Sequence, residues 1–409
     1  MTALYFASLS YNGYQDNFLN QLHSEASDAG KFFINIAKRI NPCRFVTRNG
    51  EWSLPWEQEL IPKFQMPAYD SSFNKTFAEV TDASAIRLKH RIQQGEKFAL
   101  MYSGGIDSTV ILTAMIKNLT IEELKSFTVC ASVTSMIENP HMWERYIKDK
   151  IHVIDSKTVK YDDLIEMGYT PITADEGDCI FGTSLGLTLY NNFDYYIESV
   201  SPSIKPKLQA LKYKISSADV HYSVYADLLI KHFSIASDPT FGKLLYEKYV
   251  WNAETASVPI HSLHDFFWWL IFNVKYLNCA VRGALFHNDR IDYRTAIEKI
   301  ETWYSGTEYQ LWSMVNNNNG QKIKKTVASY KWAAREYIWD LDHNDYYKFF
   351  KLKTESFQFI VNKQDFTKSK ILPQARIGFD TDYQPMSVDD PATQDYFRQA
   401  ILNYKIDWS

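Results

Sequence analysis

The chain has 409 residues, 45% hydrophobic and 22% charged, which suits two or three globular units and excludes a collagen-like or disordered chain. Lysine plus arginine number 44 against 48 aspartate plus glutamate, so no positive excess indicates a nucleic-acid backbone as partner. Aromatic residues make up 15%, enough for a large core and for the contact face of a homodimer.

The predicted elements begin with a small mixed α+β segment over residues 1–85. Arg44 to Leu54 indicates a hairpin that turns at Asn49-Gly50, because this pair supplies the positive φ angles of a two-residue turn. The apolar spacing from Ser72 to Gln94 predicts a helix that leads into the next unit.

Residues 86–200 alternate between short apolar runs and helical patterns. Strands are expected at Phe98 to Tyr102, Ser126 to Val133, 151–157 and 170–175, and helices at Asp107 to Asn118, 141–150 and 161–169. This alternation predicts an α/β fold, a parallel sheet with helices on both faces.

Residues 201–409 are expected to be mostly helical. Helical periodicity covers Ala218 to Phe233, Phe241 to Trp251, Ser262 to Phe286 and Ser329 to Asp340. We find no convincing strand pattern in this half. The most apolar run, Phe266 to Val274, spans less than half of the ~20 residues that a membrane helix needs.

Cysteine usage and the N-terminal residues bear on the compartment. The 4 cysteines form no C-x-x-C pair, which disfavours a zinc site and sulfur transfer through a cysteine pair. The first residues show no signal-peptide pattern. We therefore expect a cytoplasmic protein that has no membrane partner.

The segment YSGGIDST, Tyr102 to Thr109, carries the most informative pattern. It follows a predicted buried strand and opens a helix, and its two glycines allow the backbone to approach a ligand closely. Successive N–H groups and the helix N-terminus then form an anion cradle, to which three hydroxyls add donors. Asp107 beside a phosphate implies a bridging cation, and we expect Mg²⁺. The alternative is a tight turn with a serine or aspartate N-cap.

This segment resembles the pyrophosphate-binding loop of the N-type ATP pyrophosphatases, which include asparagine synthetase and β-lactam synthetase. The resemblance implies a fold similar to the adenine-nucleotide α-hydrolases, ATP with Mg²⁺, and transfer of AMP to a carboxylate or carbonyl oxygen. It implies that main-chain groups at strand ends read the adenine. The residues so implied to bind ATP or pyrophosphate are Tyr102, Ser103, Gly104, Gly105, Asp107, Ser108, Thr109, Val129, Cys130, Ala131 and Gly177.

A second segment, DEGDCIFG from Asp175 to Gly182, resembles the acidic loop of asparagine synthetase, roughly E-G-x-D-E-L-F-G. The resemblance implies that Asp178 joins Asp107 as a Mg²⁺ ligand and that Asp175 carries out acid/base work near the attacking nitrogen. Two residues depart from the pattern, because Asp175 replaces a glutamate and Cys179 replaces the glutamate after the metal ligand.

Two later segments resemble the family more weakly. LDHNDYYKFFKLKTESF implies that Lys353 is the catalytic lysine that neutralises the triphosphate, with Lys351 as the alternative register. KWAAREYIWDL resembles the family's lysine-to-arginine helix, with Arg335 at the arginine. Helix packing and phosphate contact are two equal alternatives for the role of Arg335. From its position after the second strand, Glu138 is a candidate for the acceptor pocket.

Together these resemblances imply an ATP-dependent, AMP-forming ligase that lacks a glutaminase domain, for which 85 residues are too few. The acceptor would be a small-molecule carboxylate or a nucleobase, and the nitrogen would come from ammonia, an amine or a separate glutaminase. A nucleotide- or base-modifying enzyme of the same superfamily and a catalytically silent ATP-binding protein remain alternatives. The short N-terminal module also resembles that of asparagine-synthetase-like proteins of large bacteriophages.

Overall fold

The computed structural model describes residues 47–48, 62–182, 197–198, 202–203, 205–211, 214, 217, 219–233, 239–286, 290–316, 320–324, 329–349, 378–379 and 385–386. The chain divides into two compact units built from distant segments. The helical unit comprises Met1–Phe73, Asp175–Phe286 and Ser313–Lys322; the sheet unit comprises Asn74–Ala174, His287–Trp312 and Ile323–Ser409. Most of the hairpin expected at Arg44 to Leu54 lies outside the described residues.

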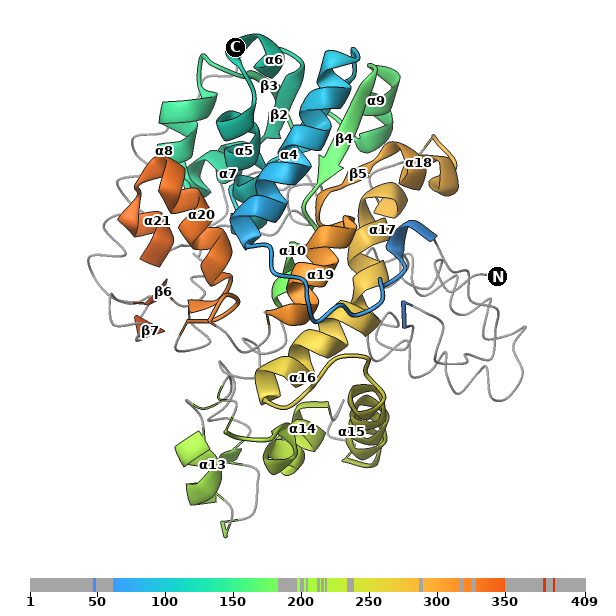
Figure 1. Cartoon of the computed structure of the whole chain (residues 1–409), viewed down its shortest axis with the longest axis vertical. Helices are drawn as coiled ribbons and strands as arrows, with labels where there is room; N and C mark the ends of the chain where they lie inside the picture. Colours follow the sequence, from blue (N-terminus) through green and yellow to red (C-terminus); the bar gives the residue numbers. More distant parts are fainter. Residues whose placement is uncertain are drawn as a thin grey trace. The chain divides into compact units, whose positions relative to one another are not determined.

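Five described strands form one parallel sheet in the order β3-β2-β1-β4-β5, which confirms the α/β class (Figure 1). They are β1 (Lys97–Met101), β2 (Phe127–Ala131), β3 (His152–Asp155), β4 (Tyr169–Thr173) and β5 (Glu301–Thr302). Side chains of β1 and β2 are buried almost throughout, as expected for central strands of a parallel sheet. The strand order reverses between β1 and β4, which makes this boundary the topological switch point of the sheet.

The register brings the ends of β1 and β4 to the same level. Leu100 of β1 pairs with Val129 of β2 on one side and with Ile172 of β4 on the other. Because all three strands are parallel, the segments that follow them leave from one edge of the sheet. Ligands of open α/β sheets bind at this edge, beside the switch point.

Strand β5 corrects the expectation that residues 201–409 contain no strand. Its two residues extend the sheet beyond β4 through the pair Ile172 and Glu301. Two more short strands, β6 (Gly378–Phe379) and β7 (Pro385–Met386), pair antiparallel. Strands of two residues show no alternation of apolar and polar side chains, so only their partners define them.

Three helices of the sheet unit pack against one another: α4 (Phe77–Gln93), α5 (Ile106–Asn118) and α20 (Trp332–Asp342). Helix α4 begins at Phe77 rather than at Ser72 because Thr76 caps it. The Thr76 hydroxyl accepts the Glu79 N–H at 3.2 Å, and the Glu79 carboxylate accepts the Thr76 N–H at 2.7 Å.

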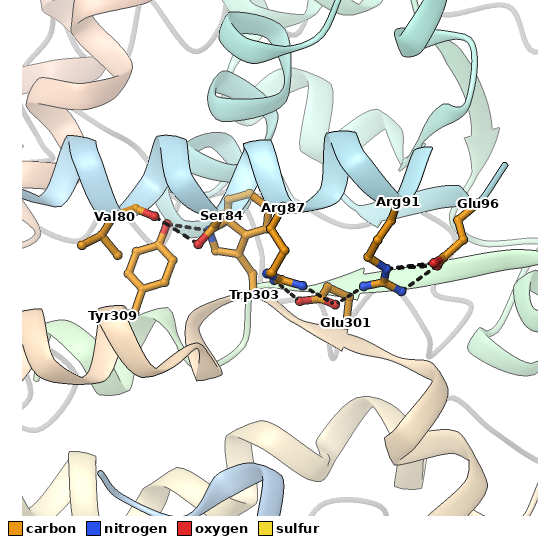
Figure 2. Close-up of polar contacts among 8 residues, drawn as sticks. All are labelled: Val80, Ser84, Arg87, Arg91, Glu96, Glu301, Trp303 and Tyr309. Atoms are coloured by element: carbon orange, nitrogen blue, oxygen red, sulfur yellow. Dashed lines mark hydrogen bonds and ion pairs between the residues drawn. The ribbon is translucent and has the colours of Figure 1, made fainter. Parts of the chain in front are cut away.

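Helix α4 is also tied to the edge strand β5 by ion pairs (Figure 2). Arg87 and Arg91 both reach Glu301, at 2.6 and 2.8 Å, and Arg91 also binds Glu96 at 2.7 Å. Shared pairs of this kind hold the short strand β5 against the helix that precedes β1.

The remaining elements of the sheet unit connect these parts. They are α6 (Ile121–Leu124), α7 (Val133–Glu138), α8 (Pro140–Met142), η3 (Trp143–Ile147), α9 (Tyr161–Glu166), α18 (Tyr293–Lys299), η7 (Trp303–Ser305), α21 (Asp345–Phe349) and α19 (Thr307–Val315), whose last residues belong to the helical unit.

The helical unit is built around one long helical run. Its elements are η2 (Pro62–Phe64), α10 (Gly177–Phe181), α13 (Lys205–Leu211), η5 (Tyr222–Tyr225), α14 (Ala226–Phe233), α15 (Pro239–Glu254), α16 (Leu263–Trp269), η6 (Leu270–Lys275) and α17 (Tyr276–Phe286). The last three form the run predicted at Ser262 to Phe286, with a π-helical middle. The helix predicted from Ala218 instead begins at Ala226, after the 3₁₀ turn η5.

A buried arginine fastens the N-terminal part to this run. The Arg48 guanidinium donates to the Phe64 carbonyl at 2.9 Å and lies 3.6 Å from the ring centroid of Tyr276. Burial lowers the pKa of Arg48 to about 10, still far above neutral pH. No helix within the described ranges combines the length and the apolar character that crossing a membrane requires.

Candidate functional site

The glycine loop, Tyr102 to Gly105, joins β1 to α5 at the switch point. Serine hydroxyls satisfy two of its N–H groups: Ser108 Oγ accepts from Ser103 N at 3.2 Å, and Ser103 Oγ accepts from Gly105 N at 3.2 Å. Ser103, Gly105 and Asp107 keep partial solvent access, whereas Gly104, Ser108 and Thr109 are buried. The loop is therefore partly accessible to solvent at Ser103 and Gly105, at the start of a 13-residue helix.

Gly104 cannot be replaced without moving the loop. Its φ is +73°, in the left-handed region, and a Cβ there would lie 2.3 Å from the Ser135 carbonyl oxygen and 2.8 Å from Glu138 Cβ. The loop thus packs backbone against helix α7, which follows the neighbouring strand β2. Only glycine suits this position, because it adopts a left-handed backbone at little cost and has no Cβ to overlap with α7.

Two tyrosines from distant parts of the chain hold the carbonyl groups of this region. The Tyr347 hydroxyl donates to the Gly104 carbonyl at 2.9 Å and lies 3.1 Å from Thr109 Oγ1. The Tyr304 hydroxyl donates to the Asp107 carbonyl at 2.8 Å. Fixing the carbonyls also fixes the adjoining N–H groups, so the cradle is preorganised.

The Asp107 side chain forms an ion pair with Lys331, the residue that precedes α20. Lys331 Nζ lies 2.5 Å from Asp107 Oδ2, and the two side chains are 5% and 21% exposed. A buried ammonium loses hydration worth several kcal/mol, which a close carboxylate offsets. The glycine loop is therefore equipped with a cation as well as with N–H donors.

Lys331 is a residue that the sequence reasoning missed. Its φ is +56°, a left-handed conformation that is uncommon for lysine and that clusters at functional positions. The only sequence signal was its place at the start of KWAAREYIWDL. Nothing local indicated that its side chain would turn toward Asp107, 224 positions earlier.

Arg335 from the same segment has contacts that favour helix packing. Its Nε donates to the Tyr330 carbonyl at 2.9 Å, and its Nη1 donates to the Lys348 carbonyl at 2.8 Å. The first bond fixes the backbone just before Lys331, and the second joins α20 to α21. Lys353 and Lys351 lie outside the described residues.

A second carboxylate lies beside the glycine loop. Glu138 is 6% exposed, and its Oε1 lies 3.7 Å from where a Cβ on Gly105 would be. The structure thus places Glu138, expected near an acceptor pocket, against the loop itself. With Asp107 and Glu138 both near the cradle, a polyphosphate there requires cations, and Lys331 supplies one.

Three of the residues expected to bind adenine are the last three residues of strand β2. Val129, Cys130 and Ala131 are fully buried, and burial raises the pKa of the Cys130 thiol to about 12. The Cys130 carbonyl accepts the Tyr102 N–H at 2.9 Å, and the Ala131 carbonyl accepts the Ser156 N–H at 2.9 Å. Both carbonyls already take part in sheet hydrogen bonding, so any adenine contact would use their second lone pairs.

The acidic segment begins two residues after β4 and forms α10 in the helical unit. Asp175 and Asp178 are partly exposed, whereas Gly177 and Cys179 between and beside them are buried. Gly182 ends the helix with a φ of +70°, and a Cβ there would lie 2.4 Å from Trp268 Cβ. Close packing against α16 therefore fixes the C-terminal end of α10, the helix that carries Asp178 in its first turn.

Glu176 is the second residue that the sequence reasoning missed. Its side chain is fully buried, and neither carboxyl oxygen has a hydrogen-bond partner among the described residues. Burial, and next the charge of Asp175, raise the pKa of Glu176 well above its usual value. The resemblance of the acidic segment gives no role to a carboxyl group at this position.

Mg²⁺ suits the groups present at the loop. The ion takes hard oxygen ligands and is usually held by one or two carboxylates together with substrate phosphates and water. Asp107 offers a partly exposed carboxylate beside an N–H cradle. Asp107 would hold such an ion at the loop. In the part of the chain that is described, no group of three or more His, Cys, Asp or Glu residues is placed to hold a metal ion.

Comparisons of the chain with models of protein families, with curated proteins and with solved structures found no match.

Proposed function

We propose that this chain is an ATP-dependent, AMP-forming ligase that makes a carbon–nitrogen bond to a small-molecule carboxylate. The glycine loop after β1, with Lys331 against Asp107, is the observation that carries the proposal. A loop rich in N–H donors, a helix N-terminus and a buried ammonium together favour a polyanion. An aspartate at the centre of this arrangement favours a polyanion that brings a divalent cation, as ATP does.

The place of the loop in the sheet supports the same proposal. Both motifs singled out in the sequence follow strands that flank the switch point, YSGGIDST after β1 and DEGDCIFG after β4. A nucleotide at the loop would place its phosphates at the edge from which both segments leave. In this proposal the acidic segment, which follows β4 in the chain, serves the reacting phosphate.

The chemistry needs two displacements. A carboxylate oxygen of the acceptor attacks the α-phosphorus of ATP, the bond to the β-phosphate breaks, and pyrophosphate leaves from the glycine loop. Ammonia or an amine then attacks the acyl carbon, AMP leaves with the bonding electrons, and the nitrogen loses one proton. Lys331 and the loop N–H groups would stabilise the charge on pyrophosphate, and Asp175 is the proposed proton acceptor. Bound Mg²⁺ would supply further neutralisation of the triphosphate.

The first experiment measures the phosphate products. We would incubate the purified chain with ATP and Mg²⁺, with and without aspartate plus ammonium, and separate AMP, ADP, pyrophosphate and phosphate. We expect aspartate-dependent AMP and pyrophosphate in equal amounts. ADP with phosphate would overturn the assignment.

A matched pair of variants ties the products to the loop. Asp107→Asn should lower AMP formation by about 100-fold or more, the scale seen when one preorganised electrostatic group is removed. Asp340→Asn is the control, because Asp340 is also an aspartate paired with a lysine, Lys117 at 3.1 Å, but at the surface. Asp107→Asn with full activity would contradict the proposed site.

Two other outcomes lead to the alternative functions. AMP formation with nucleotides or free bases, and none with amino acids, would indicate a nucleobase-modifying enzyme. ATP binding without any turnover would indicate a nucleotide-binding protein, for which the replacements at Asp175 and Cys179 in the acidic segment would be the first explanation to test.

A further inference from the structure

The ion pair between Lys331 and Asp107 restricts how a metal ion reaches the loop. The Lys331 ammonium lies 2.5 Å from Asp107 Oδ2 and is almost fully buried. The Asp107 carboxylate is also the group that the proposed function assigns to Mg²⁺. A divalent cation brought to this carboxylate alone would lie next to a buried ammonium, and their repulsion is only weakly screened in such a place.

A polyphosphate reverses this balance. Its oxygens attract both the ammonium and the divalent ion, so the two cations are then separated by negative charge. The lysine backbone needs no movement, because Arg335 fixes it: Arg335 Nε binds the Tyr330 carbonyl, and the Arg335 N–H donates to the Lys331 carbonyl at 3.0 Å. Only the flexible lysine side chain has to change partner.

We propose that Lys331 neutralises Asp107 in the nucleotide-free protein and moves to a phosphate oxygen when a polyphosphate binds. The loop would consequently admit a divalent cation only together with the polyphosphate. This inference rests on the proposed function, since it takes Asp107 as a metal ligand. Lys331 acts here as a positioning residue whose partner changes with the ligand.

The test measures metal binding without turnover. Mn²⁺ would be titrated into the full chain and free Mn²⁺ read by electron paramagnetic resonance, with and without the non-cleavable analogue α,β-methylene-ATP, each reading being corrected for the Mn²⁺ that the analogue binds without protein. We expect wild-type protein to bind Mn²⁺ at least about 10-fold more weakly without the analogue. A thermal melt gives a second readout, in which Mn²⁺ alone should not raise the melting temperature of the wild type.

The informative variant is Lys331→Asn. Asparagine tolerates the left-handed backbone of this position but is too short to reach Asp107. We expect Mn²⁺ alone to bind this variant about 10-fold more tightly than wild type and to raise its melting temperature. Lys331→Arg, which retains the positive charge, should bind Mn²⁺ alone as weakly as wild type. If the asparagine variant does not fold, the comparison of wild type with and without bound analogue still decides the proposal. Lys117→Asn, which removes the surface lysine paired with Asp340, is the matched control and should change nothing.

The outcomes separate this inference from the proposed function. If the analogue binds but Mn²⁺ affinity is the same in wild type, Lys331→Asn and Lys331→Arg, the partner exchange is wrong and the nucleotide site stands. If wild type binds Mn²⁺ equally well with and without bound analogue, the exchange is also wrong. If calorimetry detects no analogue binding to wild-type protein, the proposed function fails and the exchange fails with it.

Discussion

Replacement of Gly104 by alanine tests whether the glycine loop is held by its contact with helix α7. Gly104 has a φ of +73°, and an added Cβ would meet the Ser135 carbonyl oxygen at 2.3 Å and Glu138 Cβ at 2.8 Å. Left-handed backbone costs an alanine about 1–2 kcal/mol. The steric overlap adds about 1–3 kcal/mol, the usual cost of overpacking. We therefore expect Gly104→Ala to lower the free energy of unfolding by about 2–5 kcal/mol.

Gly95 provides the matched control. Its φ is +96°, yet no atom lies within 4 Å of where its Cβ would be. Gly95→Ala should therefore show the backbone cost alone, about 1–2 kcal/mol. Urea denaturation of both variants, followed by tryptophan fluorescence, gives the difference. Equal destabilisation of the two variants would refute the packing of the loop against α7, and a Gly104→Ala variant that binds α,β-methylene-ATP as wild type does would refute its role in the cradle.

Two further predictions concern groups beneath and beside the loop. Tyr347→Phe removes the hydroxyl that donates to the Gly104 carbonyl, and should cost about 1–3 kcal/mol in thermal or urea unfolding because a buried acceptor loses its donor; stability equal to wild type would show that the bond is not formed. Asp342 is buried, and burial raises its pKa from 3.8 to about 6, so its ionised form destabilises the fold above pH 6 and the effect fades as pH falls toward 3.8. Asp342→Asn should therefore raise the free energy of unfolding by about 1–2 kcal/mol relative to wild type at pH 7.5, and this gain should shrink by pH 4.5. A difference in unfolding free energy that does not depend on pH would contradict this reasoning.

Local signals in the sequence were enough for the order of elements in the sheet unit. Apolar runs of four or five residues at β1 and β2, separated by helical spacing, predicted parallel strands within one or two residues of their observed ends. The boundaries moved where capping decided them. Thr76 shortened the first helix, and Ser132, expected within the second strand, instead caps α7 through its bond from the Ser135 N–H at 3.3 Å.

The sequence by itself determined the glycine loop, because a turn between a strand and a helix depends on adjacent residues: two glycines, the two serines whose hydroxyls accept the N–H groups of Ser103 and Gly105, and the apolar flanks. Only the tertiary structure decided what surrounds that loop. Lys331 and Tyr347 reach it from 224 and 243 positions away, and β5 exists only as a partner of β4. Such pairings depend on the packing of the whole chain, and no spacing rule along the sequence encodes them.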